Sequence, residues 1–413
     1  MPEFRSFKAF RPKQEFAQKV AAKPYDVLNS DEARKEVKNN PLSFLHIGKP
    51  EVDLDPSIDL HDPRVYAKGK ENLQKLIDDK VLVQDPEDYL YLYSQTMNDR
   101  TQYGFVGCVN AEDYWNDNIK KHEKTRKDKE QDRCEHVRIT NAHTGPIFLT
   151  MPDNQELLDI IKNISANEPD NDLVDNMEVR HTSWVIRDKS VSNRIQTILK
   201  DTKYFYIADG HHRSAAGAIV AKERAKANPN HNGTEEYNYY LAVLFPASHL
   251  MIMDYNRVVQ DLNGNTKEEF FSKLEKVFDI EEQVNKQYKP KKKGEIGLYI
   301  GYKWYKCTFK PQFQSNDPVE GLDVSLLQNN VLNPILGIDD PRTNKRIDFI
   351  GGIRGLNEIA YRVNWGGMVV GFAMYPTSVQ ELMAIADAGA IMPPKSTWFE
   401  PKLADGMFVH FME

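Results

Sequence analysis

The sequence predicts an α+β fold that is divided into two domains, and three observations lead to this prediction. A chain of 413 residues is longer than a domain with a single hydrophobic core usually is. The composition shifts near residue 261, and helical and strand-like segments alternate on both sides of that shift. We therefore expect one domain over residues 1–260 and a second, smaller α+β domain over residues 261–413, whose end at residues 392–402 returns to the functional site.

Local patterns predict the elements of the first domain. Charged or amphipathic runs favour helices over residues 30–40, 65–79, 112–138, 153–166 and 192–199. Aromatic and β-branched runs favour strands over residues 40–51, 147–150, 177–186, 203–208 and 239–245, and residues 87–108 indicate two strands joined by a polar turn.

The same patterns continue in the second domain. The amphipathic pattern of residues 266–278 predicts a helix. Helices are also predicted over residues 324–332, 355–364 and 377–388. Strands are predicted over residues 296–300, 304–309, 347–350 and 368–374. The alternation of the two element types favours an α+β unit.

Bulk composition limits the class of protein. The hydrophobic fraction of 40% is ample for packed cores, and the net charge of −7 argues against general nucleic-acid binding. Three widely spaced cysteines form neither a disulfide framework nor a zinc pattern, which fits a reducing cytoplasm. The N-terminus lacks the apolar run of a signal peptide, and no apolar run is long enough to span a bilayer. We expect a cytoplasmic protein with no nucleic-acid or membrane partner, and a homodimer is a possible assembly.

The most informative stretch is KYFYIADGHHRSAAGAIVAKERA, residues 203–225. A buried strand turns at Gly210 into a helix N-terminus, where unpaired N–H groups and the helix dipole favour an anion. The turn carries a carboxylate, two imidazoles and a guanidinium, from Asp209, His211, His212 and Arg213. The alternative is that Asp209 only caps the helix and the other side chains are solvated, and both interpretations stay open.

A second informative stretch is residues 112–138, which contains no glycine or proline and is expected to be largely helical. Spacings of three and four place Glu123, Arg126, Glu130 and Arg133 on one face of such a helix, with His122 on an overlapping set. This charged face is either part of a site or a solvated surface laced with ion pairs.

The third stretch is MPPKSTWFEPK, residues 392–402. Two prolines fix the backbone before Lys395 and Thr397, which can contact a phosphate or a carboxylate. No GxxxxGK[ST] pattern precedes them, so the segment is not a P-loop. The alternative is a rigid loop that docks Trp398 and Phe399.

These motifs, together with IADGHHR, HEKTRKDKEQDR and NPLSFLHIGKPE, resemble the domain-of-unknown-function 1015 family over nearly the whole chain. The resemblance implies a ParB/sulfiredoxin-like fold for the N-terminal part, in which a strand, a polar turn and a helix N-terminus bind nucleotide phosphates. That superfamily includes free-serine kinases with a comparable turn. The chain lacks the arginine-rich turn and the helix-turn-helix of partitioning ParB proteins, and it lacks the Gly-Cys-His-Arg turn of sulfiredoxin.

The resemblance implies a role for each candidate residue. The catalytic candidates are Glu123, Asp209, His211 and His212, with Glu123 as the base for a substrate hydroxyl and Asp209 as the metal ligand. The nucleotide- or phosphate-binding candidates are Gly210, Arg213, Ser214, Arg126, Lys395 and Thr397. His122 and Arg133 are expected to contact the substrate. The cofactor implied is Mg²⁺ with ATP or ADP.

Three functions compete at this point. The first is a nucleotide-dependent kinase in serine metabolism, which phosphorylates the hydroxyl of free serine or a similar metabolite. The second is a metal-dependent phosphatase or hydrolase that acts on a small phosphorylated metabolite. Its metal ligands would have to come from Asp209, His122 or His143, because His211-His212 alone is too short a set for zinc. The third is a non-catalytic regulator that switches conformation with CTP or ATP.

Overall fold

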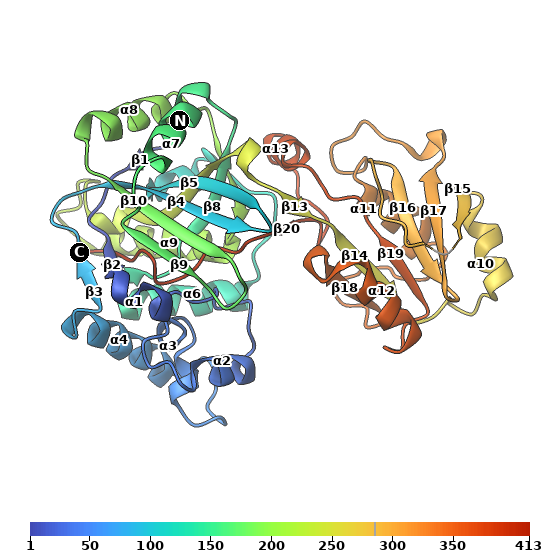
Figure 1. Cartoon of the computed structure of the whole chain (residues 1–413), viewed down its shortest axis with the longest axis horizontal. Coiled ribbons are helices and arrows are strands. Elements are labelled where there is room, and N and C mark those ends of the chain that lie inside the picture. The colour runs from blue at the N-terminus through green and yellow to red at the C-terminus, as the bar shows by residue number, and fades with distance from the viewer. Residues whose placement is uncertain (285) are drawn as a thin grey trace. The chain divides into compact units, whose positions relative to one another are not determined.

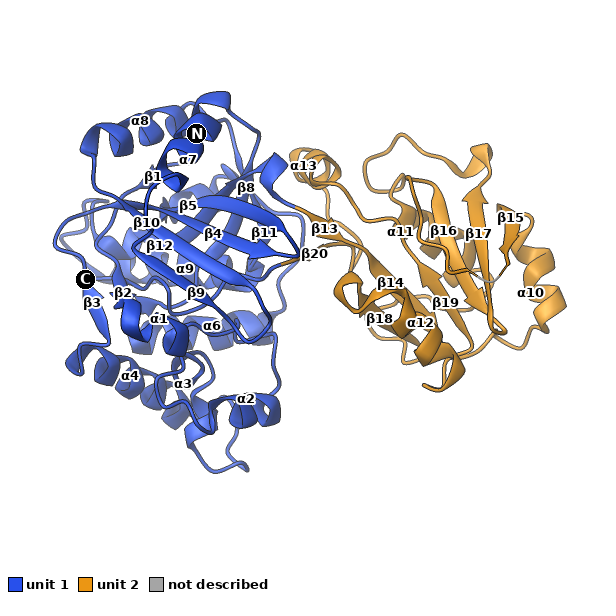
Figure 2. Cartoon of the chain, in the orientation of Figure 1, with its two compact units in different colours: residues 1–250, 401–413 blue, residues 251–400 orange. Residues whose placement is uncertain are grey.

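The computed structural model describes residues 1–284 and 286–413 and divides into two compact units (Figures 1 and 2). Unit 1 comprises Met1–Leu250 and Pro401–Glu413, and unit 2 comprises Met251–Glu400. Each unit has its own sheet and its own helices, so the mixed α+β prediction is confirmed. Within the described residues, no helix is both long enough and apolar enough to cross a membrane.

Unit 1 is built on a nine-stranded mixed sheet in the order β6-β11-β8-β12-β5-β4-β10-β9, with β1 paired to β5. Its strands are β1 (Phe4–Arg5), β4 (Leu90–Met97), β5 (Arg100–Asn110), β6 (Ile119–Lys120), β8 (Ile147–Met151), β9 (Asn171–Val174), β10 (Arg180–Ile186), β11 (Phe205–Asp209) and β12 (Tyr239–Pro246). Two pairs, β11 with β6 and β12 with β8, are parallel. Every residue of β12 is buried, as expected of an inner strand that is covered on both faces.

The longer helices of unit 1 have seven residues or more, and some of them begin at a side-chain cap. They are α1 (Gln14–Val20), α2 (Ser30–Val37), α4 (Pro63–Asp78), α6 (Lys127–Thr140), α7 (Gln155–Ser165), α8 (Lys189–Lys200) and α9 (His211–Ala227). Asn29 and Glu32 form a capping box at α2, and Asp188 caps α8. In Figure 1, α7 and α8 lie above the sheet of unit 1, and α1 to α4 with α6 lie below it. Short elements complete the unit: β2 (Phe10–Pro12), α3 (Leu45–Gly48), β3 (Leu82–Gln84), α5 (Glu112–Trp115), β7 (Ala142–His143) and β21 (His410–Phe411).

Unit 2 is a six-stranded antiparallel sheet in the order β15-β17-β16-β19-β14-β18. Its strands are β14 (Tyr255–Val259), β15 (Phe278–Gln283), β16 (Glu295–Ile300), β17 (Lys303–Phe309), β18 (Ile347–Gly351) and β19 (Val370–Ala373), and a separate two-stranded pair joins β13 (Ile252–Met253) to β20 (Trp398–Phe399). The helices are α10 (Lys267–Leu274), α11 (Asp323–Leu327), α12 (Gly355–Asn364) and α13 (Val379–Asp387). Ile359 of α12 packs against Val258 and Tyr299, which anchors this helix to the sheet.

Most of the predicted elements are confirmed, because their patterns are local. The strand–turn–helix at residues 203–225 is β11 followed by α9, and the strand pair at residues 87–108 is β4 and β5. The turn between β4 and β5 places Asn98 and Asp99 at positive φ. In unit 2, the helix expected over residues 324–332 is an α-helix that continues as a π-helix at Gln328–Leu332.

Two predictions are wrong. Residues 40–51 form α3 and a 3-10 turn at Pro50–Asp53 in place of a strand. Residues 112–138 form α5, β6, a loop and then α6, so that Glu123 and Arg126 precede the helix and do not share a face with Glu130 and Arg133. The reason is tertiary: Ile119 pairs with Phe205 in the sheet, and this pairing overrides local helix propensity.

The carboxyl group of Asp323 in unit 2 is buried, and the pH dependence of stability can test this burial. Asp323 opens α11, is 6% exposed, and accepts the Gly294 N–H. Burial raises the pKa of Asp323 to about 7, with Glu381 and Glu295 adding to the rise. A raised carboxyl pKa contributes stability below the unfolded value of 3.8 that is lost as the pH rises to about 7.

We therefore expect Asp323→Asn, which keeps an oxygen for Gly294, to raise the thermal unfolding temperature at pH 8 and to leave it nearly unchanged at pH 4. The control is Asp279→Asn, at an exposed position of β15, which should change little at either pH. An effect of Asp323→Asn that is equal at the two pH values would contradict the assignment.

Candidate active site

The turn between β11 and α9 depends on the backbone freedom of one glycine. Gly210 has φ +87°, a left-handed conformation that residues with a Cβ adopt only at a cost. It is the N-cap of α9 and offers no side-chain cap to the first N–H groups of the helix. The N-terminus of a 17-residue helix is therefore open to an anion at this position.

Asp209, whose side chain is 33% exposed, ends β11. Its Oδ2 atom lies 2.9 Å from Nζ of Lys402, and its Oδ1 atom accepts the Gly210 N–H at 2.9 Å. Burial on its own would raise the pKa of Asp209, but Lys402, Arg213 and the Gly210 N–H together hold that pKa well below its ordinary value. Asp209 is therefore ionised at neutral pH, and it holds a lysine from the end of the chain beside the turn.

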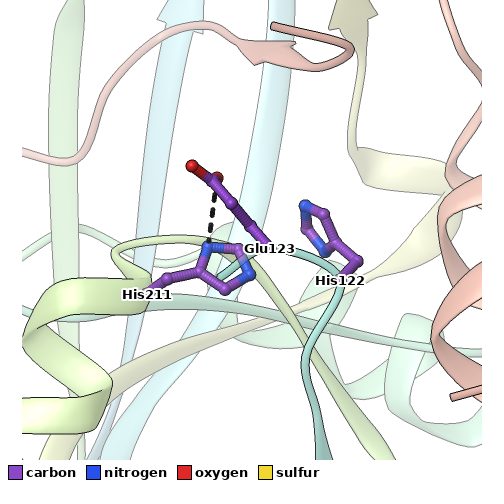
Figure 3. Close-up of side chains that lie close together, drawn as sticks. All are labelled: His122, Glu123 and His211. Atoms are coloured by element: carbon purple, nitrogen blue, oxygen red, sulfur yellow. Dashed lines mark ion pairs between the residues drawn. The ribbon is translucent and has the colours of Figure 1, made fainter. Parts of the chain in front are cut away.

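Three candidate residues meet next to this turn (Figure 3). His211 opens α9, and His122 and Glu123 lie in the loop that follows β6. The Oε2 atom of Glu123 is 3.7 Å from Nδ1 of His211, and the two imidazole rings are perpendicular with centroids 4.5 Å apart. The structure thus brings His122, Glu123 and His211 together, the first two from a loop and not from a helix.

The two imidazoles are buried, whereas the carboxylate is open to solvent. His122 is 2% exposed and His211 is 6% exposed, while the side chain of Glu123 is 58% exposed. Burial lowers the pKa of His122 to about 4, and burial with the neighbouring His122 lowers the pKa of His211 well below its ordinary value. Both rings are therefore neutral at neutral pH, and each keeps a nitrogen lone pair.

A second cluster of polar side chains surrounds Arg213, whose own side chain is 12% exposed. Its Nη1 atom lies 3.4 Å from Oδ1 of Asp405, and both residues line a cavity of about 30 Å³ together with Tyr25 and Arg133. A space of this size holds water rather than a metabolite. Burial raises the pKa of Asp405 to about 7, although Arg213 acts in the opposite direction.

The remaining predicted residues lie in different surroundings. The Arg126 backbone N–H donates to Nε2 of His212 at 3.1 Å, and its guanidinium pairs with Asp128. The hydroxyl of Ser214 is fully buried and lies 3.2 Å from that of Tyr240.

Arg133 pairs with Asp132, and its guanidinium lies 4.0 Å above the ring of Tyr25. Lys395 and Thr397 belong to unit 2, where Lys395 has φ +58° and its carbonyl accepts a hydrogen bond from Arg257.

Sequence reasoning missed two residues that the structure places at the turn. Lys402 contacts Asp209 from 193 positions away, and Asp405 contacts Arg213 from 192 positions away. The one signal for Lys402 was its place at the end of the MPPKSTWFEPK motif. No periodicity or spacing connects Asp405 to the turn.

A substitution of Gly210 tests whether the turn requires glycine at this position. A Cβ at this position would lie 3.3 Å from Nε of Arg213, and φ is +87°. Gly233 has a similar φ of +92° but no atom within 4 Å of the added Cβ. We expect Gly210→Ala to lower the free energy of unfolding by about 1 kcal/mol or more, and by more than the control Gly233→Ala, in chemical denaturation. Equal effects of the two substitutions would show that Arg213 does not crowd the turn.

Comparison with known proteins assigns the family. The family model described as "Protein of unknown function (DUF1015)" matches residues 4–325, and the comparison with curated proteins gives no match. Among solved structures, the chain is similar to a free serine kinase in complex with AMP, with 12% sequence identity and a TM-score of 0.34 over 71% of this chain and 86% of that chain.

Two further solved structures are similar at the same level. A conserved hypothetical protein from Pyrococcus furiosus has 15% identity and a TM-score of 0.34, over 73% of this chain and 93% of that chain. SbnI with C-terminal truncation from Staphylococcus aureus has 10% identity and a TM-score of 0.36, over 73% of this chain and 85% of that chain. Similarity at this level assigns no activity, whereas the family model covers well over half of the sequence. The chain therefore belongs to the DUF1015 family.

Proposed function

We propose that the protein is a nucleotide-dependent kinase that transfers a phosphoryl group to the hydroxyl of a small metabolite, with free serine as the leading acceptor. One observation carries the proposal. The open N-terminus of α9 stands beside two cationic side chains, Lys402 and Arg213, and the carboxylate of Glu123 lies at the same turn. Phosphoryl transfer needs these parts, because its catalysis consists mostly of positioning and charge neutralisation.

Each group has a defined task in this proposal. The N–H groups of the first turn of α9, with Arg213 and Lys402, bind phosphate oxygens. Asp209 is the ligand for the Mg²⁺ that accompanies ATP or ADP. Glu123 accepts the proton of the acceptor hydroxyl, the oxygen attacks the terminal phosphorus, and the bond to the remaining nucleotide breaks. His122 and Arg133 contact the acceptor, and His212 keeps the 122–126 loop beside the turn through the Arg126 N–H.

The proposal also includes a fold relationship, further residues and a cellular setting. The ParB/sulfiredoxin-like relationship would explain why a strand–turn–helix carries the phosphate contacts. Lys395 and Thr397 of unit 2 remain proposed phosphate-binding residues on the strength of their motif alone, and Ser214 is proposed as a first-turn residue that supports the helix start. Serine metabolism in the cytoplasm is the proposed setting.

A second candidate function is metal-dependent hydrolysis of a small phosphorylated metabolite. The observation that favours it is the grouping of His122, Glu123 and His211, whose ligand atoms all lie within 4.8 Å of one another. A metal ion held there would activate a water molecule beside the phosphate-binding turn. Hydrolysis without any acceptor dependence would support this function over the kinase.

The substitution Glu123→Gln tests the kinase proposal. We expect acceptor-dependent ATP or ADP consumption to fall at least about 100-fold, because a positioned general base contributes about that much. Nucleotide affinity should change by no more than a few fold. The matched control is Glu112→Gln, at an exposed position in the first turn of α5, which should keep full activity.

The measurement is coupled nucleotide consumption with a panel of amino acids and related hydroxyl compounds. If the unmodified protein consumes no ATP or ADP with any acceptor, the kinase proposal fails. Tight nucleotide binding without turnover would leave the regulator as the better description.

Substitutions of Lys402 and Asp209 test whether the turn binds the phosphates of a nucleotide. We expect Lys402→Met to weaken nucleotide binding about 10-fold or more, since a charge-assisted hydrogen bond contributes about 1.5–3 kcal/mol. The substitution also leaves Asp209 without its cation, so the double substitution Asp209→Asn with Lys402→Met separates lost phosphate contact from lost stability.

Thermal-shift titration with ATP, ADP and CTP, with and without Mg²⁺, gives the readout. Lys222→Met, at an exposed position of α9, is the charge-matched control and should bind like the unmodified protein. Nucleotide binding that is unchanged in the double variant would remove Lys402 and Asp209 from the site.

A further inference from the structure

We propose that His122, Glu123 and His211 form a binding site for one divalent transition-metal ion of the Zn²⁺, Mn²⁺ or Fe²⁺ class. The inference concerns metal binding by itself and does not rest on the proposed kinase activity. It starts from the mutual distances of the three side chains, whose ligand atoms lie within 4.8 Å of one another.

One of these distances is close to that between two ligands of a metal ion. Ligands that bind a tetrahedral ion at about 2.1 Å lie about 3.4 Å apart. The Glu123 Oε2 and His211 Nδ1 atoms are 3.7 Å apart, so this pair needs almost no movement. Glu123 is on a loop and its side chain is 58% exposed, which allows the small adjustment that coordination requires.

A second, independent observation points to a ligand. His122 Nδ1 and His211 Nε2 are buried and have no hydrogen-bond partner within residues 1–284 and 286–413. A buried polar atom without a partner costs about 1–3 kcal/mol, so two such atoms on adjacent rings are unfavourable unless something compensates them. An ion takes one nitrogen of each ring, so an ion held beside Glu123 through Nδ1 of His211 compensates Nδ1 of His122, whereas Nε2 of His211 stays without a partner among the described residues.

The two histidines are held in place by the fold. His211 is the first residue of α9, where the Gly210 turn fixes the start of the helix, and His122 follows β6 by one residue in the chain. The ring of His122 also makes a hydrogen bond with the backbone of Ile207 in β11. A hydrogen bond from the non-coordinating nitrogen to a backbone carbonyl is the usual way to orient a metal-binding histidine.

The ligand set selects the class of metal. Two imidazole nitrogens and one carboxylate oxygen suit Zn²⁺, Mn²⁺ or Fe²⁺, and they leave coordination positions for water or substrate. Mg²⁺ and Ca²⁺ prefer sites made only of oxygen atoms. This ion is therefore distinct from the Mg²⁺ that would arrive with a nucleotide at Asp209.

Glu123 takes part in both proposals without conflict. A carboxylate can bind a metal through one oxygen and still accept a proton through the other. An ion at this position would also add positive charge beside the N-terminus of α9. Metal binding and turnover are measured separately, so one proposal can fail while the other stands.

The test is metal binding by the full-length protein after treatment with a chelator. Isothermal titration with Zn²⁺, Mn²⁺ and Co²⁺ should give one equivalent bound, and a tenfold excess of Mg²⁺ should not displace the Co²⁺. We expect His211→Asn, His122→Gln and Glu123→Gln each to weaken Co²⁺ binding at least about 10-fold. His231→Asn, at an exposed position in a loop, is the matched control and should bind as tightly as the unmodified protein.

Two readouts remain decisive if a buried histidine variant does not fold. Glu123→Gln changes an exposed side chain, and the visible spectrum of Co²⁺ bound to the unmodified protein reports nitrogen ligands in a low-coordinate site. A spectrum of fully hydrated Co²⁺, the absence of a stoichiometric metal, or unchanged affinity in Glu123→Gln would overturn the proposal. Metal binding without acceptor-dependent turnover would support this site and count against the kinase.

Discussion

The candidate site depends on the compensation of one partly buried charge, the carboxylate of Asp209 at the end of β11. An ionised carboxylate inside a protein costs several kcal/mol unless cations and hydrogen-bond donors surround it. Lys402 and the Gly210 N–H bind it directly, and Arg213 adds a second positive charge from the first turn of α9. The same groups that compensate Asp209 create a positive region at an open helix N-terminus. The stability of the turn and its proposed anion binding therefore have a common origin.

A second constraint brings the catalytic candidates to this turn. The parallel pairing of Ile119 with Phe205 joins β6 to β11, and the loop after β6 therefore emerges next to the start of α9. His122 and Glu123 come from this loop, and the Arg126 N–H holds its far end through His212. The arrangement makes the proposed base and the proposed metal ligands products of one short strand pairing.

The sequence predicted elements that depend on neighbouring residues, and it missed contacts between residues that are far apart in the chain. The strand, Gly210 and α9 followed from residue type and order, because burial, left-handed φ and helix periodicity are each encoded within a few positions. Glu123 was expected on a helix face because of its spacing, whereas the pairing of β6 with β11 produces a strand and a loop there. Lys402 and Asp405 could not be located, because their contacts span more than 190 positions. Ser214 looked like a first-turn contact, yet its hydroxyl lies 3.2 Å from that of Tyr240 in the core.

The most direct test of the central claim is a crystal structure of the full chain with ADP and Mg²⁺. The account predicts that the terminal phosphate lies at the N-terminus of α9, within hydrogen-bond distance of the backbone between Gly210 and Arg213 and of the Lys402 ammonium. It also predicts that the carboxylate of Glu123 faces the open side of that phosphate. Nucleotide bound elsewhere on the chain, with Lys402 still paired only to Asp209, would contradict it.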